Sequence, residues 1–315
     1  MKHKILHRIV NKIDNNNIYK SIIENLSLAD LQSLLLEIYR DKSGRLNYSN
    51  LLNQYKSNRF VQHTKIPFER SMKFDEYAFS KLPKGYNTLE LSPVSPLGTS
   101  SVVAPVDQHN ILTTVRNTEV CSDSSNVLAL ESAVIREKLL KTRQTQNQKV
   151  KLCTSHRVLR TQLMEGKDCV PHFRLLSLCA AGRDAGSYKF ESDTLYEQLA
   201  YYIELLLNLK QLAITLKNIK IVFSVFDNNI TEKIKIITHE LLKLSPETRF
   251  EFNNSKEKQN YYQTLRYNIF ATNSKDEEYF LCDGGFTDWT QKLLQNKKER
   301  YLISGFGSER LFLVF

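Results

Sequence analysis

The residues best suited to chemistry lie near the end of the chain, in residues 305–315, which read Gly-Phe-Gly-Ser-Glu-Arg and then an apolar run. Residues 301–304 predict a short strand, the glycines let the backbone approach a ligand closely, and Arg310 follows where a helix could start. Such a segment can hold a phosphate. A Gly-x-Gly turn between strand and helix is also common as a plain connection, so this segment alone leaves both interpretations open.

A second candidate segment begins with Val-Pro-His-Phe-Arg at 170–174, continues through a glycine-broken loop at 180–186 and returns as Ser-Tyr-Lys-Phe-Glu at 187–191. A strand, a loop and a returning strand with an aromatic residue predict a hairpin that could hold a nucleotide. Arginine grips two phosphate oxygens with its planar fork, and an aromatic ring can stack on a base. We therefore expect Arg174 at the α-phosphate and Phe190 under the base.

A third segment, Gly-Tyr-Asn-Thr-Leu-Glu-Leu-Ser-Pro at 85–93, follows a helix predicted over 68–82. In their order, the three segments resemble motifs 1, 2 and 3 of the class II aminoacyl-tRNA synthetases. Within that class the chain is most similar to the histidyl-tRNA synthetase group. Residues 124–133 resemble that group's Arg-Pro-Glu-Gly-Thr-Ala stretch, and Asp-Gly-Gly-Phe-Thr-Asp at 283–288 resembles its Gly-Gly-Arg-Tyr-Asp. The resemblance covers residues 66–315.

This resemblance implies a site for ATP and Mg²⁺ beside a pocket for an amino acid or a related small carboxylic acid. The implied catalytic residues are Arg174, on the α-phosphate, and Arg310, on the γ-phosphate. The ATP site is completed by Phe190, Arg183, Gly307 and Glu309, and Glu309 is a candidate magnesium ligand. The acid would contact Glu131, through its ammonium group, together with Arg116, Gly284 and Gly285.

The sequence also departs from the family pattern. Leu176 stands where motif 2 usually has a glutamate, and no segment matches the histidyl group's Arg-Gly-Leu-Asp-Tyr-Tyr. Tyr261, Tyr262 and Arg266 lie nearby in a different order. The chain ends five residues after Arg310, where a synthetase would continue into an anticodon-binding domain. A complete tRNA-charging enzyme is therefore not expected.

The bulk properties indicate a globular protein with anionic partners. The chain has 315 residues, 41% of them hydrophobic, and a formal charge of +10. Residues 1–70 hold 12 Lys/Arg against 6 Asp/Glu, and residues 136–160 hold eight basic residues against Glu137 alone. Nucleotides, RNA or an acidic protein are natural partners for such charge, although a solvated basic face is an equally simple interpretation.

No membrane partner is expected, because no stretch of 18 apolar residues exists, and the N-terminus lacks the features of a secretory signal. We expect a cytoplasmic protein. The five cysteines include no Cys-x-x-Cys pair, so we interpret them as small buried hydrophobes rather than as disulfides or zinc ligands.

The periodicity predicts an α+β fold, with an antiparallel or mixed sheet of six to seven strands flanked by helices. Residues 1–65 are expected to form a basic helical region, and residues 66–315 the catalytic core. Ser27 and Asp30 predict a capping box before a leucine-rich helical stripe, which would be core or would bind a partner. Further strands are expected at 110–116, 118–121, 218–226, 248–253, 267–272 and 278–282, and helices at 127–142, 193–216, 230–244 and 289–295.

Two functions follow from these features. The first is a stand-alone, homodimeric class II synthetase-like ligase that adenylates a small acid and transfers it to a non-standard acceptor. That acceptor would be a carrier protein, a small molecule, or an RNA met by the basic N-terminal region. The second is a non-catalytic regulatory or scaffolding paralogue. The arginines of motifs 2 and 3 favour the first function, and the departures favour the second.

Overall fold

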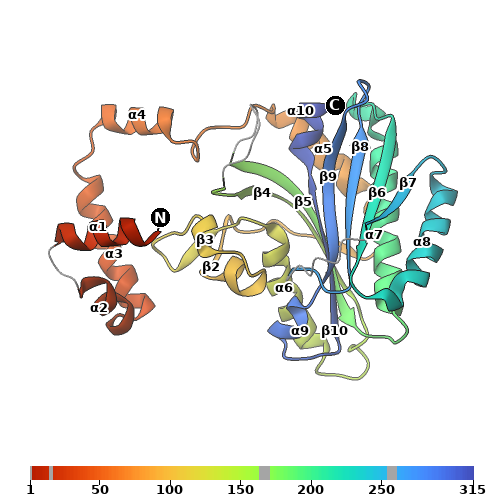
Figure 1. Ribbon diagram of the computed structural model, residues 1–315, viewed down its shortest axis with the longest axis horizontal. Helices are drawn as coiled ribbons and strands as arrows, with labels where there is room; N and C mark the ends of the chain where they lie inside the picture. The colour runs from red at the N-terminus through yellow and green to blue at the C-terminus, as the bar shows by residue number, and fades with distance from the viewer. Residues whose placement is uncertain (1, 14–16, 163–170, 254–260) are drawn as a thin grey trace.

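An eight-stranded mixed sheet forms the centre of the computed structural model, which describes residues 2–13, 17–162, 171–253 and 261–315 (Figure 1). The strand order is β1-β4-β5-β10-β9-β8-β6-β7. The outer pairs β1–β4 and β6–β7 are parallel and the pairs between them are antiparallel. The strands are β1 Tyr86–Thr88, β4 Val150–Leu159, β5 His172–Arg183, β6 Asn218–Val225, β7 Arg249–Asn253, β8 Leu265–Thr272, β9 Glu278–Thr287 and β10 Glu299–Gly307. The α+β class is confirmed, with one strand more than expected.

Helices cover both faces of this sheet. On one face lie α5 (Phe68–Ser80), α7 (Lys189–Leu207) and α8 (Thr231–Leu244), and on the other α6 (Ser124–Leu139) and α9 (Trp289–Leu293). Alternate residues of β5 serve the two cores: Leu176 and Leu178 pack under α7, whereas Cys179 and Ala181 pack under α6. Because a strand has a side-chain period of two, burial on both faces makes residues 175–181 of β5 apolar at every position but Ser177.

A small two-stranded sheet, β2 (Val94–Pro96) and β3 (Thr118–Val120), precedes α6 and fixes where that helix begins. Its central residue, Glu119, is fully buried. The carboxylate accepts hydrogen bonds from Gly98 N at 2.8 Å, Ser100 N at 2.7 Å and Gln108 Nε2 at 2.9 Å. Burial raises the pKa of Glu119, but the hydrogen bonds outweigh burial and hold this pKa below its ordinary value. The ionised carboxylate thus ties the preceding loop to β3.

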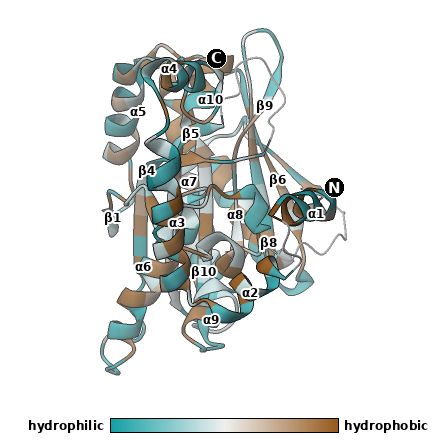
Figure 2. Ribbon diagram, turned by 90° about the vertical axis from the view of Figure 1, so that its left-hand side faces the viewer, coloured by the Kyte–Doolittle hydropathy of each residue, from teal (hydrophilic) through white to brown (hydrophobic). Residues whose placement is uncertain are grey.

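The N-terminal helices are α1 (Lys2–Ile13), α2 (Ile18–Asn25), α3 (Leu28–Ser43) and α4 (Tyr48–Ser57). The capping box is confirmed, since Ser27 and Asp30 each accept from the other's backbone N–H, and Gly44 is the C-cap of α3. None of the residues of α2, α3 and α4, all of which are described, is buried. Figure 2, viewed from the side of these helices, shows apolar residues along them, and Leu34, Ile38 and Tyr39 of α3 are exposed. The leucine stripe is therefore not core, and the boundary at residue 65 stays a prediction.

Two expected elements differ from the structure, and one strand was not expected. Residues 110–116 form no strand, because Asp107 accepts from His109 N and turns the backbone into a short 3-10 helix, which leaves only a Thr113–Glu119 bridge. The helix expected over 193–216 runs instead from Lys189 to Leu207. Strand β4 was not expected at all, since its basic residues resemble a surface segment.

Apart from the strand expected at 187–191, the other expected helices and strands are present with small shifts of their ends. Cys121, Cys153, Cys179 and Cys282 are free and buried, as expected, while Cys169 lies outside the described residues. In the described part of the chain, no helix combines the length and apolar character that crossing a membrane requires.

Candidate functional site

The glycine-containing segment lies at the turn from β10 into α10 (Ser308–Val314). Gly305 and Gly307 stand opposite Ser177 and Leu175 of β5, so the turn lies beside the first residues of that strand. Arg310 is exposed on the first turn of α10; its Nη1 donates to Phe280 O at 3.0 Å and its guanidinium lies 5.9 Å from the Phe280 ring centroid. The strand, turn and helix start predicted here are confirmed.

A cavity of about 170 Å³ opens beside this turn, and we call it cavity 2. Gly307, Glu309 and Arg310 line one side, and Arg174 and Phe280 contribute to the rest. Arg174 and Arg310 therefore border the same space, as the proposed phosphate site requires. The pairing of β5 with β10 brings these two arginines close together.

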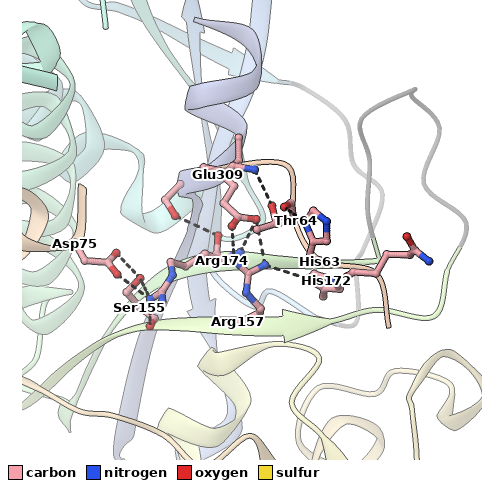
Figure 3. A network of polar contacts seen from close by, with 11 residues as sticks. His63, Thr64, Asp75, Ser155, Arg157, His172, Arg174 and Glu309 are labelled. Carbon is pink, nitrogen blue, oxygen red and sulfur yellow. Dashed lines mark hydrogen bonds and ion pairs between the residues drawn. The ribbon is translucent and has the colours of Figure 1, made fainter. Parts of the chain in front are cut away.

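Arg174 is held by an ion pair inside the protein. Its Nη1 donates to Asp75 Oδ2 at 2.8 Å and to Ser155 O at 3.1 Å (Figure 3). Burial raises the pKa of Asp75, and the Ser155 hydroxyl and Arg174 offset that effect only in part. The buried Nε of Arg174 has no hydrogen-bond partner among the described residues. The guanidinium is thus only partly satisfied by the protein.

The returning strand expected at 187–191 is wrong. The hairpin at this end of the sheet is made by β4 and β5, and residues 184–191 instead lead from β5 into α7. Phe190 belongs to the first turn of α7 and is 1% exposed, packed so closely against Gly182 that a Cβ there would lie 2.8 Å from its ring. An aromatic residue in an amphipathic helix can pack in the core as readily as against a ligand, and Phe190 does not line cavity 2.

Sequence reasoning missed Arg157, which stands opposite Arg174 on the β4–β5 hairpin. Its guanidinium forms an ion pair with Glu309, which is only 4% exposed, while Glu309 also accepts from Arg174 N at 3.4 Å (Figure 3). The available signal was an arginine near the end of an alternating run, 17 residues before Arg174. Residue 170, the start of the expected motif 2 strand, lies outside the described residues.

A larger cavity of about 350 Å³, which we call cavity 1, adjoins cavity 2. Its charged and phenolic lining groups are two carboxylates, two guanidinium groups and two phenols, contributed by Asp123, Asp283, Arg160, Arg266, Tyr261 and Tyr262. These residues come from α6, β8, β9 and the loops around them. The charges balance, so the cavity suits a small ligand with both a cationic and an anionic group.

The two carboxylates have different surroundings. Asp123 caps α6, accepting from Ser125 N at 3.0 Å, and lies 3.4 Å from Arg160 Nη2. Asp283 accepts from Tyr262 Oη at 2.9 Å and lies 3.8 Å from Arg266 Nη2. Burial raises the pKa of Asp283, although the Tyr262 hydrogen bond and Arg266 act against it. A cationic ligand group beside Asp283 would favour the ionised form.

The two phenols also line cavity 1. Tyr261 and Tyr262 meet edge to face with ring centroids 4.8 Å apart, and Tyr261 packs against Trp289 in the same way at 5.1 Å. Burial, followed by the nearby carboxylates, raises the pKa of both tyrosines well above the usual value. Both therefore remain hydrogen-bond donors at neutral pH. The pair that stood in an unexpected order in the sequence is thus part of the site.

Gly284 and Gly285 act through packing. A Cβ on Gly285 would lie 2.3 Å from Leu265 O and 2.6 Å from the Tyr262 ring, and a Cβ on Gly284 would lie 2.5 Å from the Tyr267 ring. Neither glycine lines a cavity, whereas their neighbour Asp283 lines both. The absence of a side chain at Gly285 leaves the space that Tyr262 occupies.

Three expected site residues lie elsewhere. Glu131 and Arg116 are exposed and line neither cavity; the first turn of α6, with Asp123, faces cavity 1 instead. Arg183 lies at the far end of β5, nine residues from Arg174 and so roughly 30 Å away along an extended strand, where it contacts Gln146. One nucleotide cannot contact both Arg183 and Arg174. These positions matched by residue type, but helix phase and strand length place them away from the cavities.

Magnesium would have few protein ligands here. In residues 2–13, 17–162, 171–253 and 261–315, no three His, Cys, Asp or Glu side chains form a group that could hold a metal ion. Glu309 is the carboxylate beside Arg310, and it is paired with Arg157. Mg²⁺ in nucleotide sites is commonly held by the phosphates, waters and one or two carboxylates. The residues present fit an ion that arrives with a nucleotide.

Solved structures share this architecture. An ATP phosphoribosyltransferase regulatory subunit/histidyl-tRNA synthetase from Bacillus halodurans aligns over 80% of this chain and 81% of its own, with a TM-score of 0.56 and 13% identity. Apo histidyl-tRNA synthetase from S. aureus aligns over 80% and 70%, with a TM-score of 0.52 and 15% identity. The chain has the class II aminoacyl-tRNA synthetase-like fold.

Threonyl-tRNA synthetase shares this class II synthetase-like fold as well. The RNA binding domain of that enzyme from Cryptosporidium parvum aligns over 78% of this chain and 62% of its own, with a TM-score of 0.54 and 10% identity. No model of a known protein family and no curated protein sequence matches the chain. At such low identities the likeness establishes the class II synthetase-like fold and leaves the chemistry to be argued from the site.

Proposed function

We propose that the protein binds ATP in cavity 2 and an amino acid or related small carboxylic acid in cavity 1, and joins them as an acyl adenylate. The observation that carries this proposal is the wall shared by the cavities. Arg160, Leu175, Asp283 and Gly305 line both of them. A carboxylate at that boundary lies next to the space bordered by Arg174 and Arg310, so two reactants can meet without leaving their cavities.

The acid would be oriented by the charges of cavity 1. Asp123 and Asp283 offer oxygens to an ammonium group, and Arg160, which lines both cavities, offers its guanidinium to the carboxylate. The hydroxyl of Tyr261 supplies a donor for a polar group on the rest of the ligand, and the hydroxyl oxygen of Tyr262, whose proton is donated to Asp283, can accept a hydrogen bond. Glu131 and Arg116 have no part in this proposal, because they are exposed away from the cavities.

The nucleotide would be held by charge and by close backbone approach. Arg310 has an exposed guanidinium with capacity for phosphate oxygens, and Arg174 borders the same cavity, where a phosphate would compete with Asp75 for its guanidinium. Gly305 and Gly307 leave room for the phosphates beside the backbone. A carboxylate oxygen of the acid then attacks the α-phosphorus, the bond to the bridging oxygen of the β-phosphate breaks, and pyrophosphate departs. Mg²⁺ arriving with ATP would neutralise phosphate charge.

ATP–pyrophosphate exchange against a panel of amino acids and related acids tests this reaction. We expect exchange that depends on one acid and falls by about 10²- to 10³-fold in Arg310→Ala, the usual loss when a charge-stabilising donor is removed. Arg183→Ala is the matched control, because it removes the same side chain from the far end of β5. Exchange that survives in Arg310→Ala, or falls equally in both variants, contradicts the proposed site.

A non-catalytic role is the second candidate, and the ion pairs of the site favour it. Arg157 is paired with Glu309, and Arg174 with Asp75, so both carboxylates compete with phosphate for these guanidinium groups. In a regulatory paralogue the cavities would bind a small ligand as a signal. Binding of an acid by calorimetry with no pyrophosphate exchange, in a correctly folded protein, would support this function over the first.

The acceptor and the assembly remain part of the proposal. We propose a homodimer, and an acceptor that is a carrier protein, a small molecule, or an RNA bound by the basic N-terminal helices. Residues 1–65 carry 11 Lys/Arg and 5 Asp/Glu, which suits an anionic acceptor. Light scattering measures the assembly, and RNA binding that weakens steeply with salt would identify the acceptor class.

A further inference from the structure

One wall of cavity 2 comes from outside the sheet. Residues 59–66, which we call the strap, connect α4 to α5, and their last three residues, Thr64, Lys65 and Ile66, line cavity 2. Ile66 is only 7% exposed, so the strap is anchored in the core at this end. A ligand in cavity 2 would therefore touch the segment that joins the N-terminal helices to the sheet.

The strap is also fixed at its other end. The Arg59 guanidinium donates to Thr161 O and, at 3.3 Å, to Gln162 O, both of which follow β4. These carbonyls belong to the connection from β4 to β5, the hairpin that carries Arg157 and Arg174. The strap thus crosses the end of the sheet at which both cavities open.

A histidine links the middle of the strap to the sheet. The Nε2 of His172 contacts Gln62 O, and its Nδ1 lies 3.0 Å from Arg157 Nη1 (Figure 3). A carbonyl oxygen only accepts and a guanidinium only donates. A neutral imidazole with its proton on Nε2 satisfies both neighbours, so this is the tautomer that we assign.

The link continues to the phosphate-binding turn. Arg157 forms the ion pair with Glu309, and Glu309 precedes Arg310 in α10. Gln62, His172, Arg157 and Glu309 therefore form one continuous chain of polar contacts from the strap to the wall of cavity 2 (Figure 3). Loss of any member leaves a buried or half-buried donor or acceptor without its partner, which is costly in a shielded network.

We propose that the strap is a ligand-responsive closure of cavity 2, and that a nucleotide bound there and the seated strap stabilise each other through His172 and Arg157. This inference rests on the proposed nucleotide site. A nucleotide would contact Lys65 and Thr64 directly and would act on Glu309 through its neighbour Arg310. Because such coupling is reciprocal, whatever displaces the strap, including a partner bound to α1–α4, would weaken nucleotide binding by the same factor.

Hydrogen exchange of the full-length protein, with and without ATP and Mg²⁺, measures the strap directly, and calorimetry measures the ATP Kd. In the wild type we expect ATP to slow exchange in peptides covering residues 59–66 by at least threefold. In His172→Ala, the Kd should rise about three- to tenfold, as expected for losing one or two hydrogen bonds, and ATP should no longer slow exchange there. His239→Ala, an exposed histidine on α8, is the matched control and should behave as the wild type.

Arg59→Ala provides a second variant, because it releases the strap without touching His172, Arg157 or Glu309. Like His172→Ala, it should raise the ATP Kd. The inference is overturned if ATP binds the wild type while exchange of residues 59–66 is unchanged, or if both variants bind ATP as the wild type does. A wild type that binds no ATP overturns the proposed function itself, and the inference with it.

Discussion

The two ends of the β5–β10 pair use the same residue types for opposite purposes. At one end, Arg174 and Arg310 border cavity 2, and the guanidinium groups are only partly satisfied. At the other end, Arg136 is fully buried and donates to both oxygens of Glu299 at 2.8 Å, to Gln148 O at 2.6 Å and to Gln146 O at 2.9 Å. We call these the open end and the closed end of the pair.

This difference separates structural arginines from candidate binding arginines. At the closed end the protein supplies four hydrogen bonds to the fully buried Arg136, so this guanidinium is out of reach of a ligand and serves to hold α6 to β10. At the open end the acceptors are incomplete, and glycines occupy positions where side chains would fill the space. An arginine that the protein satisfies only in part, beside a cavity, is available for an external anion.

The largest effect is expected at the closed end. Arg136→Ala should lower the free energy of unfolding by about 3–5 kcal/mol, because it leaves the Glu299 carboxylate buried without its partner. Urea denaturation measures this, with Lys243→Ala as a control, since the exposed Lys243–Glu240 pair is screened by water and its loss should leave the stability nearly unchanged. The double variant Arg136→Met/Glu299→Leu should recover most of the loss. A loss in Arg136→Ala no larger than the control's would remove the distinction between the two ends.

The next effect concerns the glycines near the open end. Gly285→Ala should destabilise the protein by about 3 kcal/mol, because the new Cβ would lie 2.3 Å from the backbone oxygen of Leu265, which cannot move aside easily. Gly305→Ala should cost less than about 1 kcal/mol, since its Cβ would meet the flexible side chain of Leu175 at 3.3 Å. Thermal unfolding of the two variants compares them. Equal losses of stability in the two variants would contradict this explanation, because the short distance to the Leu265 oxygen would then not set the cost at Gly285.

The smallest effect has the opposite sign. Because burial raises the pKa of Asp283, ionising this carboxylate costs stability above its folded pKa. Asp283→Asn should therefore raise the free energy of unfolding at pH 7, by roughly 0.5–2 kcal/mol, which is the usual gain from a single stabilising substitution. As the pH falls through the raised pKa, the wild-type carboxyl becomes neutral and the difference should shrink toward zero. Urea denaturation of both proteins at pH 7.5 and 4.5 measures this difference in the free energy of unfolding. A difference that grows as the pH falls would contradict the prediction.

Much of the fold could be predicted because its signals are local. The capping box of Ser27 and Asp30 depends on residues three apart, and β6, β7, α8 and α9 appear where hydrophobic periodicity and turn residues indicated them. Strand β4 escaped notice because it is basic, with Lys151 and Arg157 in a run that resembles a solvated face. Only the neighbouring strand shows that Arg157 stands opposite Arg174 and has Glu309 as its counter-ion.

The site was predictable where a short segment carries it. Gly307, Glu309 and Arg310 lie together on cavity 2 as expected, because one turn positions all three. The substrate side was not predictable in the same way. Helix phase points Glu131 to solvent and brings Asp123, eight residues earlier, to cavity 1. Similar residue types within one helix could not be distinguished until the packed face was known.

The sequence by itself determined most of the elements, the α+β class and the glycine turn that presents Arg310, since each depends on backbone preferences and periodicity within a few residues. Tertiary structure alone decided which charges are paired, which are buried and which face a cavity. Asp123, Arg160, Tyr261 and Asp283 lie up to 160 positions apart in the sequence, and they surround one cavity because strand pairing and helix packing bring them there. Ion pairing and burial depend on residues that are distant in the sequence and close in space, so a local sequence pattern cannot predict them.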